Sequence, residues 1–144
     1  MKYFWLFVFM LLSSYCIAQP DISGEWRGVI TQNEGGFRSE YKFEMYFVQK
    51  GKQLTGRSYV YFDKAYAQME LIGSFTGKNT ISFQELKIVD FTVLSGLEWC
   101  IKRGNLQLKK YRGQWQLVGD WSGATSFGPC IPGKVRLKKI KPQV

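Results

Sequence analysis

Residues 40–62 of the 144-residue chain read EYKFEMYFVQKGKQLTGRSYVYF. Every second residue of the segment YKFEMYF is apolar, and Lys42 and Glu44 lie between them. Successive side chains of a β-strand point to opposite faces, so this alternation is typical of a strand with one buried face. A Lys-Gly-Lys sequence at 50–52 follows, and glycine tolerates the positive φ of a tight hairpin turn. The stretch therefore predicts two antiparallel strands joined by a short turn.

The chain beyond residue 20 repeats this pattern. Runs rich in Val, Ile, Thr, Tyr, Phe and Trp alternate with short segments that contain Gly, and no convincing amphipathic helix is found. The predicted strands span residues 24–32, 40–50, 53–62, 66–76, 79–90, 97–102, 105–111, 114–123 and 133–140. The sixth and seventh could be one bent strand, so the count is eight or nine. The predicted turns are Lys50-Gly51-Lys52, Gly77-Lys78-Asn79, Arg103-Gly104-Asn105 and Arg112-Gly113.

Short turns between consecutive strands make neighbouring strands antiparallel. An open sheet of this size would leave two exposed edges, whereas closure into a barrel removes them. Gly recurs two residues after an apolar residue, as in Leu54-Thr55-Gly56 and Leu117-Val118-Gly119, which either allows the bends of a barrel or reflects chance. We predict an all-β fold, a single antiparallel up-and-down meander closed into an 8- or 9-stranded barrel over residues 19–144. A β-sandwich is the alternative.

Residues 1–18 have the order of a secretory signal peptide. Lys2 precedes an apolar stretch that ends at Leu12, and Ala18 supplies the small residue for cleavage. A membrane anchor and a lipoprotein acylated at Cys16 are the alternatives. We predict an exported protein, periplasmic or secreted. Its two remaining cysteines, Cys100 and Cys130, then predict one disulfide, with two free buried thiols as the alternative.

Gly24-Glu25-Trp26-Arg27-Gly28 opens the first predicted strand. A Gly-x-Trp there, ahead of an up-and-down meander, resembles the calycin superfamily of lipocalins, fatty-acid-binding proteins and avidins. The chain also resembles small exported bacterial proteins of lipocalin-like type. The resemblance implies a barrel whose Trp26 packs near the closed end, with a late basic residue across its ring. Arg136 is the candidate for that residue, and no ligand is implied.

The chain contains no His, which excludes His-based triads and His metal sites. No Gly-rich phosphate loop and no cluster with metal-ligand spacing is present, so we predict no catalytic, metal or cofactor site. A hydrolase built on two carboxylates remains a third hypothesis. Its candidates are Glu85, Asp90, Glu98 and Asp120. Alternation places Glu85 inside the barrel, whereas a bulge near Gln84-Glu85 would turn it outward.

The leading functional hypothesis is a non-catalytic protein that binds a small apolar or amphipathic ligand inside the barrel. The candidate ligand-binding residues share the inward phase of their strands and are Trp26, Phe43, Met45, Val60, Met69, Phe83 and Trp121. The alternative is a protein-interaction or inhibitor module with a filled core, which uses its loops at 33–39 and 124–132 or its basic face. An interior pocket of about 300 Å³ or more would favour the ligand.

Basic residues crowd the C-terminal segment from Lys134 to Lys141. Lys134, Arg136 and Lys138 share one face of the last strand. Because an exported protein rarely meets nucleic acid, the expected partner of this face is an acidic protein or an anionic envelope surface. The alternative is a solvated strand face. The oligomeric state is left open.

Overall fold

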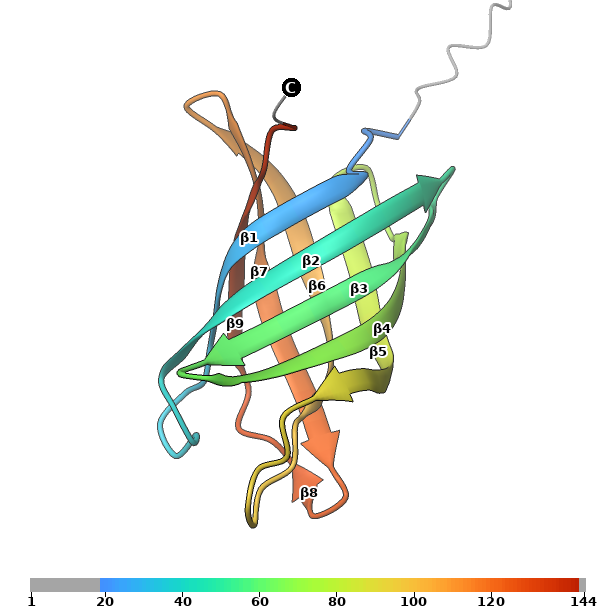
Figure 1. Cartoon of the computed structure of the whole chain (residues 1–144). Coiled ribbons are helices and arrows are strands. Elements are labelled where there is room, and N and C mark those ends of the chain that lie inside the picture. Colours follow the sequence, from blue (N-terminus) through green and yellow to red (C-terminus); the bar gives the residue numbers. More distant parts are fainter. Residues whose placement is uncertain (1–18, 143–144) are drawn as a thin grey trace, which may run out of the picture.

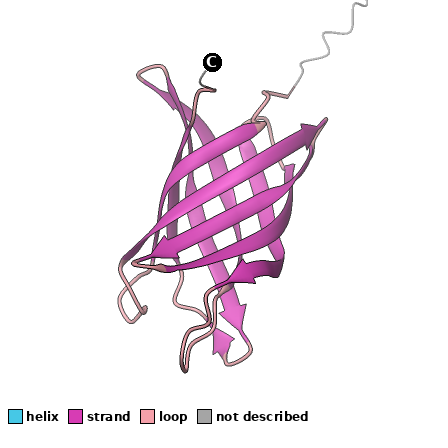
Figure 2. Ribbon diagram, in the orientation of Figure 1, coloured by secondary structure: helices cyan, strands magenta, loops and turns pink. Residues whose placement is uncertain are grey.

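The computed structural model describes residues 19–142, so the predicted signal peptide lies outside the described residues. Eight strands form one closed barrel (Figures 1 and 2). They are β1 (Gly24–Thr31), β2 (Glu40–Lys50), β3 (Gln53–Phe62), β4 (Ala65–Phe75), β5 (Thr80–Phe91), β6 (Ile101–Tyr111), β7 (Gln114–Thr125) and β9 (Gly133–Lys139). The two-residue β8 (Gly128–Pro129) pairs with the end of β7. The described residues form no helix that could cross a membrane.

The barrel closes as the sequence predicts. Each strand from β1 to β7 pairs antiparallel with the next, and β9 lies between β7 and β1. Leu137 of β9 stands opposite both Gly28 of β1 and Leu117 of β7, so the first and last strands meet. Within residues 19–142 the strand count is eight with one short addition, and the sandwich alternative is wrong.

The predicted turn at Arg103-Gly104-Asn105 is wrong, because residues 101–111 form one continuous strand. Gly104 lies opposite Trp121 of β7, and a Cβ at this position would overlap the carbonyl oxygen of Asp120. A Cβ at Gly119 would likewise overlap the carbonyl oxygen of Asn105. Glycine therefore serves here to let two strands approach closely, which supports the interpretation that the recurring glycines shape the barrel.

Apolar side chains fill the interior. One cluster of 21 buried apolar residues extends from Ile22 to Leu137. The largest of the fully buried side chains are Trp26, Phe43, Phe47, Ile22, Ile30, Met45, Leu54, Met69, Leu71, Ile81, Leu106 and Leu117. Buried and exposed side chains alternate along β2, as the sequence of residues 41–47 predicts. The centre of the barrel is therefore a packed core.

The predicted disulfide between Cys100 and Cys130 is present. It joins the loop before β6 to the segment after β8, and both lie at the lower end of the barrel in Figure 1. The bond links the β5–β6 loop to the chain that leads into the last strand. It therefore fixes the position of two loops that border one end of the barrel.

Reduction of this disulfide should lower the free energy of unfolding by about 3–4 kcal/mol, because the bond closes a loop of 30 residues in the unfolded chain. Urea unfolding followed by tryptophan fluorescence, with and without dithiothreitol, measures the difference. Beyond residue 18 the chain has no other cysteine, so the reductant acts on this bond alone. A change below about 1 kcal/mol would show that the reduced, unfolded chain retains structure that already limits its freedom.

Candidate functional site

Trp26 closes one end of the barrel. Its side chain is fully buried, and its indole Nε1 donates a hydrogen bond of 2.9 Å to the carbonyl oxygen of Ile22. The cation over its ring is Lys139, with Nζ 5.9 Å from the centroid, and not Arg136. Leu137 faces inward, so Arg136 faces solvent, whereas Lys139 follows in the inward phase where the strand ends. The expectation for Arg136 is therefore wrong by three positions.

The candidate ligand-binding residues separate into two groups. Five of them are buried within the packed core: Trp26, Phe43, Met45, Met69 and Phe83. Val60 and Trp121 instead line a cavity at the opposite end of the barrel, which we call the mouth. The interior position of all seven is as predicted. Because side chains fill the centre of the barrel, the cavity that two of them line lies at the mouth.

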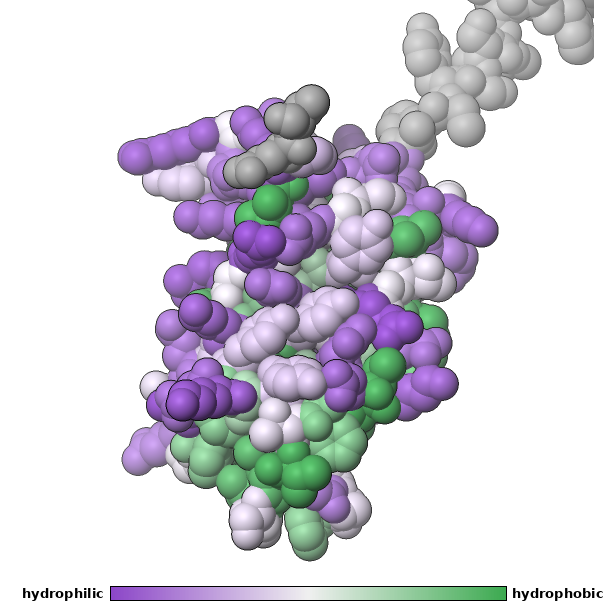
Figure 3. Space-filling model, in the orientation of Figure 1, coloured by the Kyte–Doolittle hydropathy of each residue, from purple (hydrophilic) through white to green (hydrophobic). Residues whose placement is uncertain are grey.

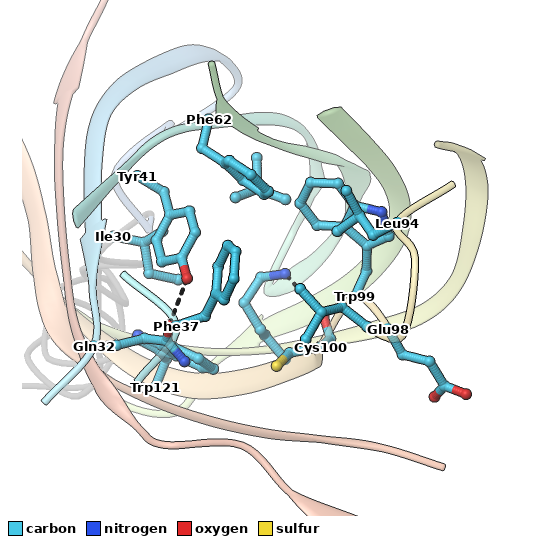
Figure 4. A pocket seen from close by; sticks show the side chains of 13 residues that line it. Ile30, Gln32, Phe37, Tyr41, Phe62, Leu94, Glu98, Trp99, Cys100 and Trp121 are labelled. Carbon is cyan, nitrogen blue, oxygen red and sulfur yellow. Dashed lines mark hydrogen bonds between the residues drawn. The ribbon is translucent and has the colours of Figure 1, made fainter. Parts of the chain in front are cut away.

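The mouth cavity has a volume of about 90 Å³ (Figure 4). Its lining residues are Ile30, Gln32, Phe37, Tyr41, Val60, Phe62, Leu94, Leu97, Glu98, Trp99, Cys100, Lys102 and Trp121. The ring of Phe62 lies among three other aromatic rings, with centroids 5.5 Å away for Phe37, 5.8 Å for Tyr41 and 5.5 Å for Trp99. The walls are therefore mainly aromatic. A space of this size holds one side chain or one small ring.

Lys102 places an ammonium group in this aromatic surrounding. Its Nζ lies 3.0 Å from the carbonyl oxygen of Cys100 and 3.0 Å from Oε2 of Glu85. An ammonium has three N–H donors, so these contacts use two of them. Its side chain lines the mouth cavity, and its Nζ lies 5.7 Å from the centroid of the Phe43 ring. Nearby, burial raises the pKa of Tyr41, whose hydroxyl donates to Oε1 of Gln32.

Glu85 is the partner that holds this ammonium. Its side chain is fully buried, and its carboxylate accepts hydrogen bonds from the Ser58 hydroxyl at 2.6 Å and the Lys102 backbone N–H at 2.8 Å. Pairing of β5 with β6 ends one residue earlier, at Gln84 opposite Arg103. The carboxylate therefore binds a backbone amide just past the last pair of that ladder. Of the two predicted positions for Glu85, the inward one is correct.

Two bulges follow Glu85 in β5. Leu71 of β4 stands opposite Glu85 and Glu70 opposite Lys87, so Leu86 has no partner. Val89 is skipped in the same way. Bulges bend a strand and increase its twist, so the end of β5 follows β4 and separates from β6. Beyond Gln84 the described residues give β5 no partner strand on its β6 side.

An apolar groove lies where the two strands separate. We call it the edge groove, and its volume is about 530 Å³. Its lining residues are Ile88, Phe91, Val93, Leu94, Leu97, Glu98, Trp99, Ile101, Ala124, Thr125 and Ser126. Leu94, Leu97, Glu98 and Trp99 also line the mouth cavity, so the groove and the cavity adjoin.

Exposed apolar side chains surround this site. Val93 and Phe127 are each 80% exposed, and Phe37 is 58% exposed. Phe91 is 48% exposed and Leu97 is 43% exposed. The space-filling view shows the apolar surface gathered at the lower end, over the β5–β6 loop and the β7–β8 turn (Figure 3). Contiguous apolar surfaces of this kind are common at protein, membrane or ligand contacts.

The four candidate carboxylates engage four separate partners. Glu85 is buried with Lys102, and the exposed Asp120 forms an ion pair of 2.8 Å with Lys134. Asp90 accepts a hydrogen bond of 2.8 Å from the Tyr66 hydroxyl, which raises the pKa of that tyrosine. Glu98 points away from the mouth cavity, as Figure 4 shows.

Hydrogen bonds from the side chain and the backbone of Ser126 lower the pKa of Glu98. The carboxylate therefore stays ionised at neutral pH and adds negative charge beside the groove. Within residues 19–142, no three His, Cys, Asp or Glu side chains are grouped as a metal site would require.

A scan against models of protein families and searches of curated proteins and of solved structures found no match to this chain.

Proposed function

We propose that the protein is a non-catalytic interaction module that binds an extended, apolar segment of another polypeptide along the edge groove. The observation that carries this proposal is the free side of β5 beyond Gln84, which lies beside an apolar groove that adjoins the mouth cavity. An exposed sheet edge accepts an added strand, whose backbone forms hydrogen bonds while alternate side chains enter neighbouring pockets. The edge groove offers both the free strand edge and adjoining apolar space for side chains.

The size of the mouth cavity fits an anchoring side chain. At about 90 Å³ it can hold one Leu or one aromatic ring, and the exposed apolar residues around it can cover the rest of a bound segment. Interfaces commonly place one apolar anchor in a pocket, with flanking contacts that exclude water.

The charge around the mouth favours a basic partner. The loops and strand ends there carry five exposed acidic residues, Glu34, Glu40, Asp63, Asp90 and Glu98. The basic residues among them are Arg38, Lys64 and Lys134; Arg38 is already bonded to Asp63 at 3.2 Å, and Lys134 to the nearby Asp120 at 2.8 Å. We therefore expect the bound segment to carry Lys or Arg beside its apolar anchor.

A small amphipathic ligand in the mouth cavity is the second candidate. It is favoured by Lys102, because the third N–H donor of its ammonium lies among aromatic rings and could bind a carbonyl or carboxylate oxygen. The filled core argues against a small ligand deep inside the barrel, since pockets for such molecules have volumes of about 300 Å³ or more. We therefore place this candidate after the polypeptide.

Selection of displayed random 12-residue peptides on the immobilised protein tests the proposal. We expect apolar, basic sequences to be enriched, and the affinity of one such peptide is then measured by fluorescence anisotropy. Val93→Ser together with Leu97→Ser should weaken its binding by at least about tenfold, because both side chains line the groove and are 80% and 43% exposed. Val48→Ser together with Ile72→Ser, at residues 42% and 44% exposed on the outer faces of β2 and β4, is the matched control and should leave binding unchanged.

Equal loss in the control would mean that the peptide binds through nonspecific hydrophobic contact, which would overturn the proposal. No enrichment, together with a small molecule retained in native mass spectra of protein from its own host, would establish the second candidate instead.

A further inference from the structure

The net charge of the protein is concentrated in one part of its sequence. Residues 99–144 contain ten Lys and Arg but a single acid, Asp120. Residues 1–98 contain ten Lys and Arg and ten acids, so their charges cancel. The whole formal charge of +9 therefore belongs to the C-terminal third, which forms β6, β7 and β9.

The fold places part of this charge at the closed end of the barrel, together with three cations from earlier in the sequence. The turns β2–β3, β4–β5 and β6–β7 all lie at that end, as does the segment after β9 (Figure 1). Their exposed basic residues are Lys50, Lys52, Lys78, Lys109, Lys110, Arg112 and Lys141. The acids near them are Asp21 and Glu25, and Glu25 is already bonded to Arg27 at 2.7 Å. Since the mouth is acidic, the barrel has opposite charges at its two ends.

The β6–β7 hairpin combines this charge with exposed aromatic rings. Tyr111 is 59% exposed and Trp115 is 37% exposed. Arg112 lies 5.2 Å from the centroid of Tyr111, and Lys110 Nζ lies 5.3 Å from the centroid of Trp115. Arg112 and Gly113 have φ values of 49° and 78°, so the turn is tight and presents both rings beside the cations. Tyr and Trp with adjacent Lys and Arg are typical of protein segments at a membrane–water interface.

We propose that the closed end of the barrel binds an anionic phospholipid surface, with the β6–β7 hairpin at the interface. The cations attract lipid phosphates within about one Debye length, roughly 8–10 Å, so the residues at this end contribute and those of the mouth do not. The two aromatic rings supply the amphipathic contact that a soluble polyanion would not require. In this orientation the mouth and the edge groove face away from the membrane and stay accessible.

Co-sedimentation with vesicles tests this inference. The protein used is the chain from Gln19 to Val144, which contains every described strand. We expect it to bind vesicles of 30% phosphatidylglycerol in phosphatidylcholine at 50 mM salt and to be released at 500 mM salt. Vesicles of pure phosphatidylcholine should not bind it.

Lys110→Glu together with Arg112→Glu should reduce this binding by at least about tenfold, since each cation near the surface contributes about fivefold. Lys42→Glu together with Lys64→Glu changes the net charge equally at exposed residues away from the closed end, and it is the matched control. The control should keep most of the binding. Brominated lipids should quench the fluorescence of the protein, because Trp115 is its most exposed described tryptophan.

Three results would overturn the inference. Equal loss in the control variant would show a response to net charge alone. Equal binding to pure phosphatidylcholine would exclude an electrostatic site. Retention on a sulfated polysaccharide without any binding to vesicles would identify a soluble polyanion as the partner of this end.

Discussion

Glu85→Ala should lower the free energy of unfolding by about 3–5 kcal/mol. The substitution leaves the Lys102 ammonium, which is 4% exposed, with the carbonyl oxygen of Cys100 as its one remaining polar contact. It also removes the acceptor of the Ser58 hydroxyl and of the Lys102 backbone N–H. A buried charge without its partner and two unsatisfied donors are among the most costly defects in a protein core. Urea unfolding with the disulfide intact measures the loss.

A double-mutant cycle separates the contribution of the Glu85–Lys102 ion pair from that of the other hydrogen bonds of Glu85. Lys102→Met in the Glu85→Ala background removes the unpaired charge, so the double variant should be more stable than the sum of the single changes by about 1–3 kcal/mol. Glu85→Gln keeps an acceptor for Ser58 and should have an intermediate stability. A loss below about 1 kcal/mol in Glu85→Ala would mean that water reaches the site and solvates Lys102.

Trp26→Ala should destabilise the protein by about 3–5 kcal/mol, because it opens a large cavity at the closed end. The indole is fully buried and holds Ile22 through the hydrogen bond from Nε1. The cation over the ring, Lys139, would lose its aromatic contact as well. Thermal unfolding followed by circular dichroism measures this effect.

Trp26→Phe serves as the control for the loss of Trp26. It retains a ring in the core and loses the indole hydrogen bond, so its destabilisation should be about 1–2 kcal/mol. If both variants were equally stable, the ring would contribute little to packing and the closed end would be less well filled than its burial indicates.

Alternation predicted the strands, because each strand has one face in the core, and the exposed edges of an open sheet predicted the closure. The same reasoning placed the seven candidate ligand-binding residues inside the barrel. The change of phase in β5 was visible in the sequence, since Ile81, Phe83 and Glu85 share one phase and Ile88 has the other. A bulge explains the change, but it lies at Leu86, one residue later than the position that would have turned Glu85 outward.

The remaining features of the turns and of the mouth cavity were not predicted, because the same residue type can have different structural roles. Glycine occupies tight turns and also close contacts between strands, so Gly104 suggested a turn that does not exist. Lys102 shares the inward phase of Leu106 and Leu108, but a lysine inside a core is uncommon, and its partner Glu85 lies 17 residues away. Phe37 and Trp99 reach the mouth cavity from loops, where no periodicity predicts the direction of a side chain.

The most direct test of the proposed binding surface is hydrogen–deuterium exchange of the protein with and without a selected apolar, basic peptide. We expect amides within residues 85–97 to become protected when the peptide is bound, because a strand added to β5 would engage residues 85–91 and its side chains would cover the groove-lining loop at 92–97. Amides of the β6–β7 hairpin, at the other end of the barrel, should be unchanged. Protection confined to that hairpin, or spread over the barrel without any change in residues 85–97, would contradict binding at the edge groove.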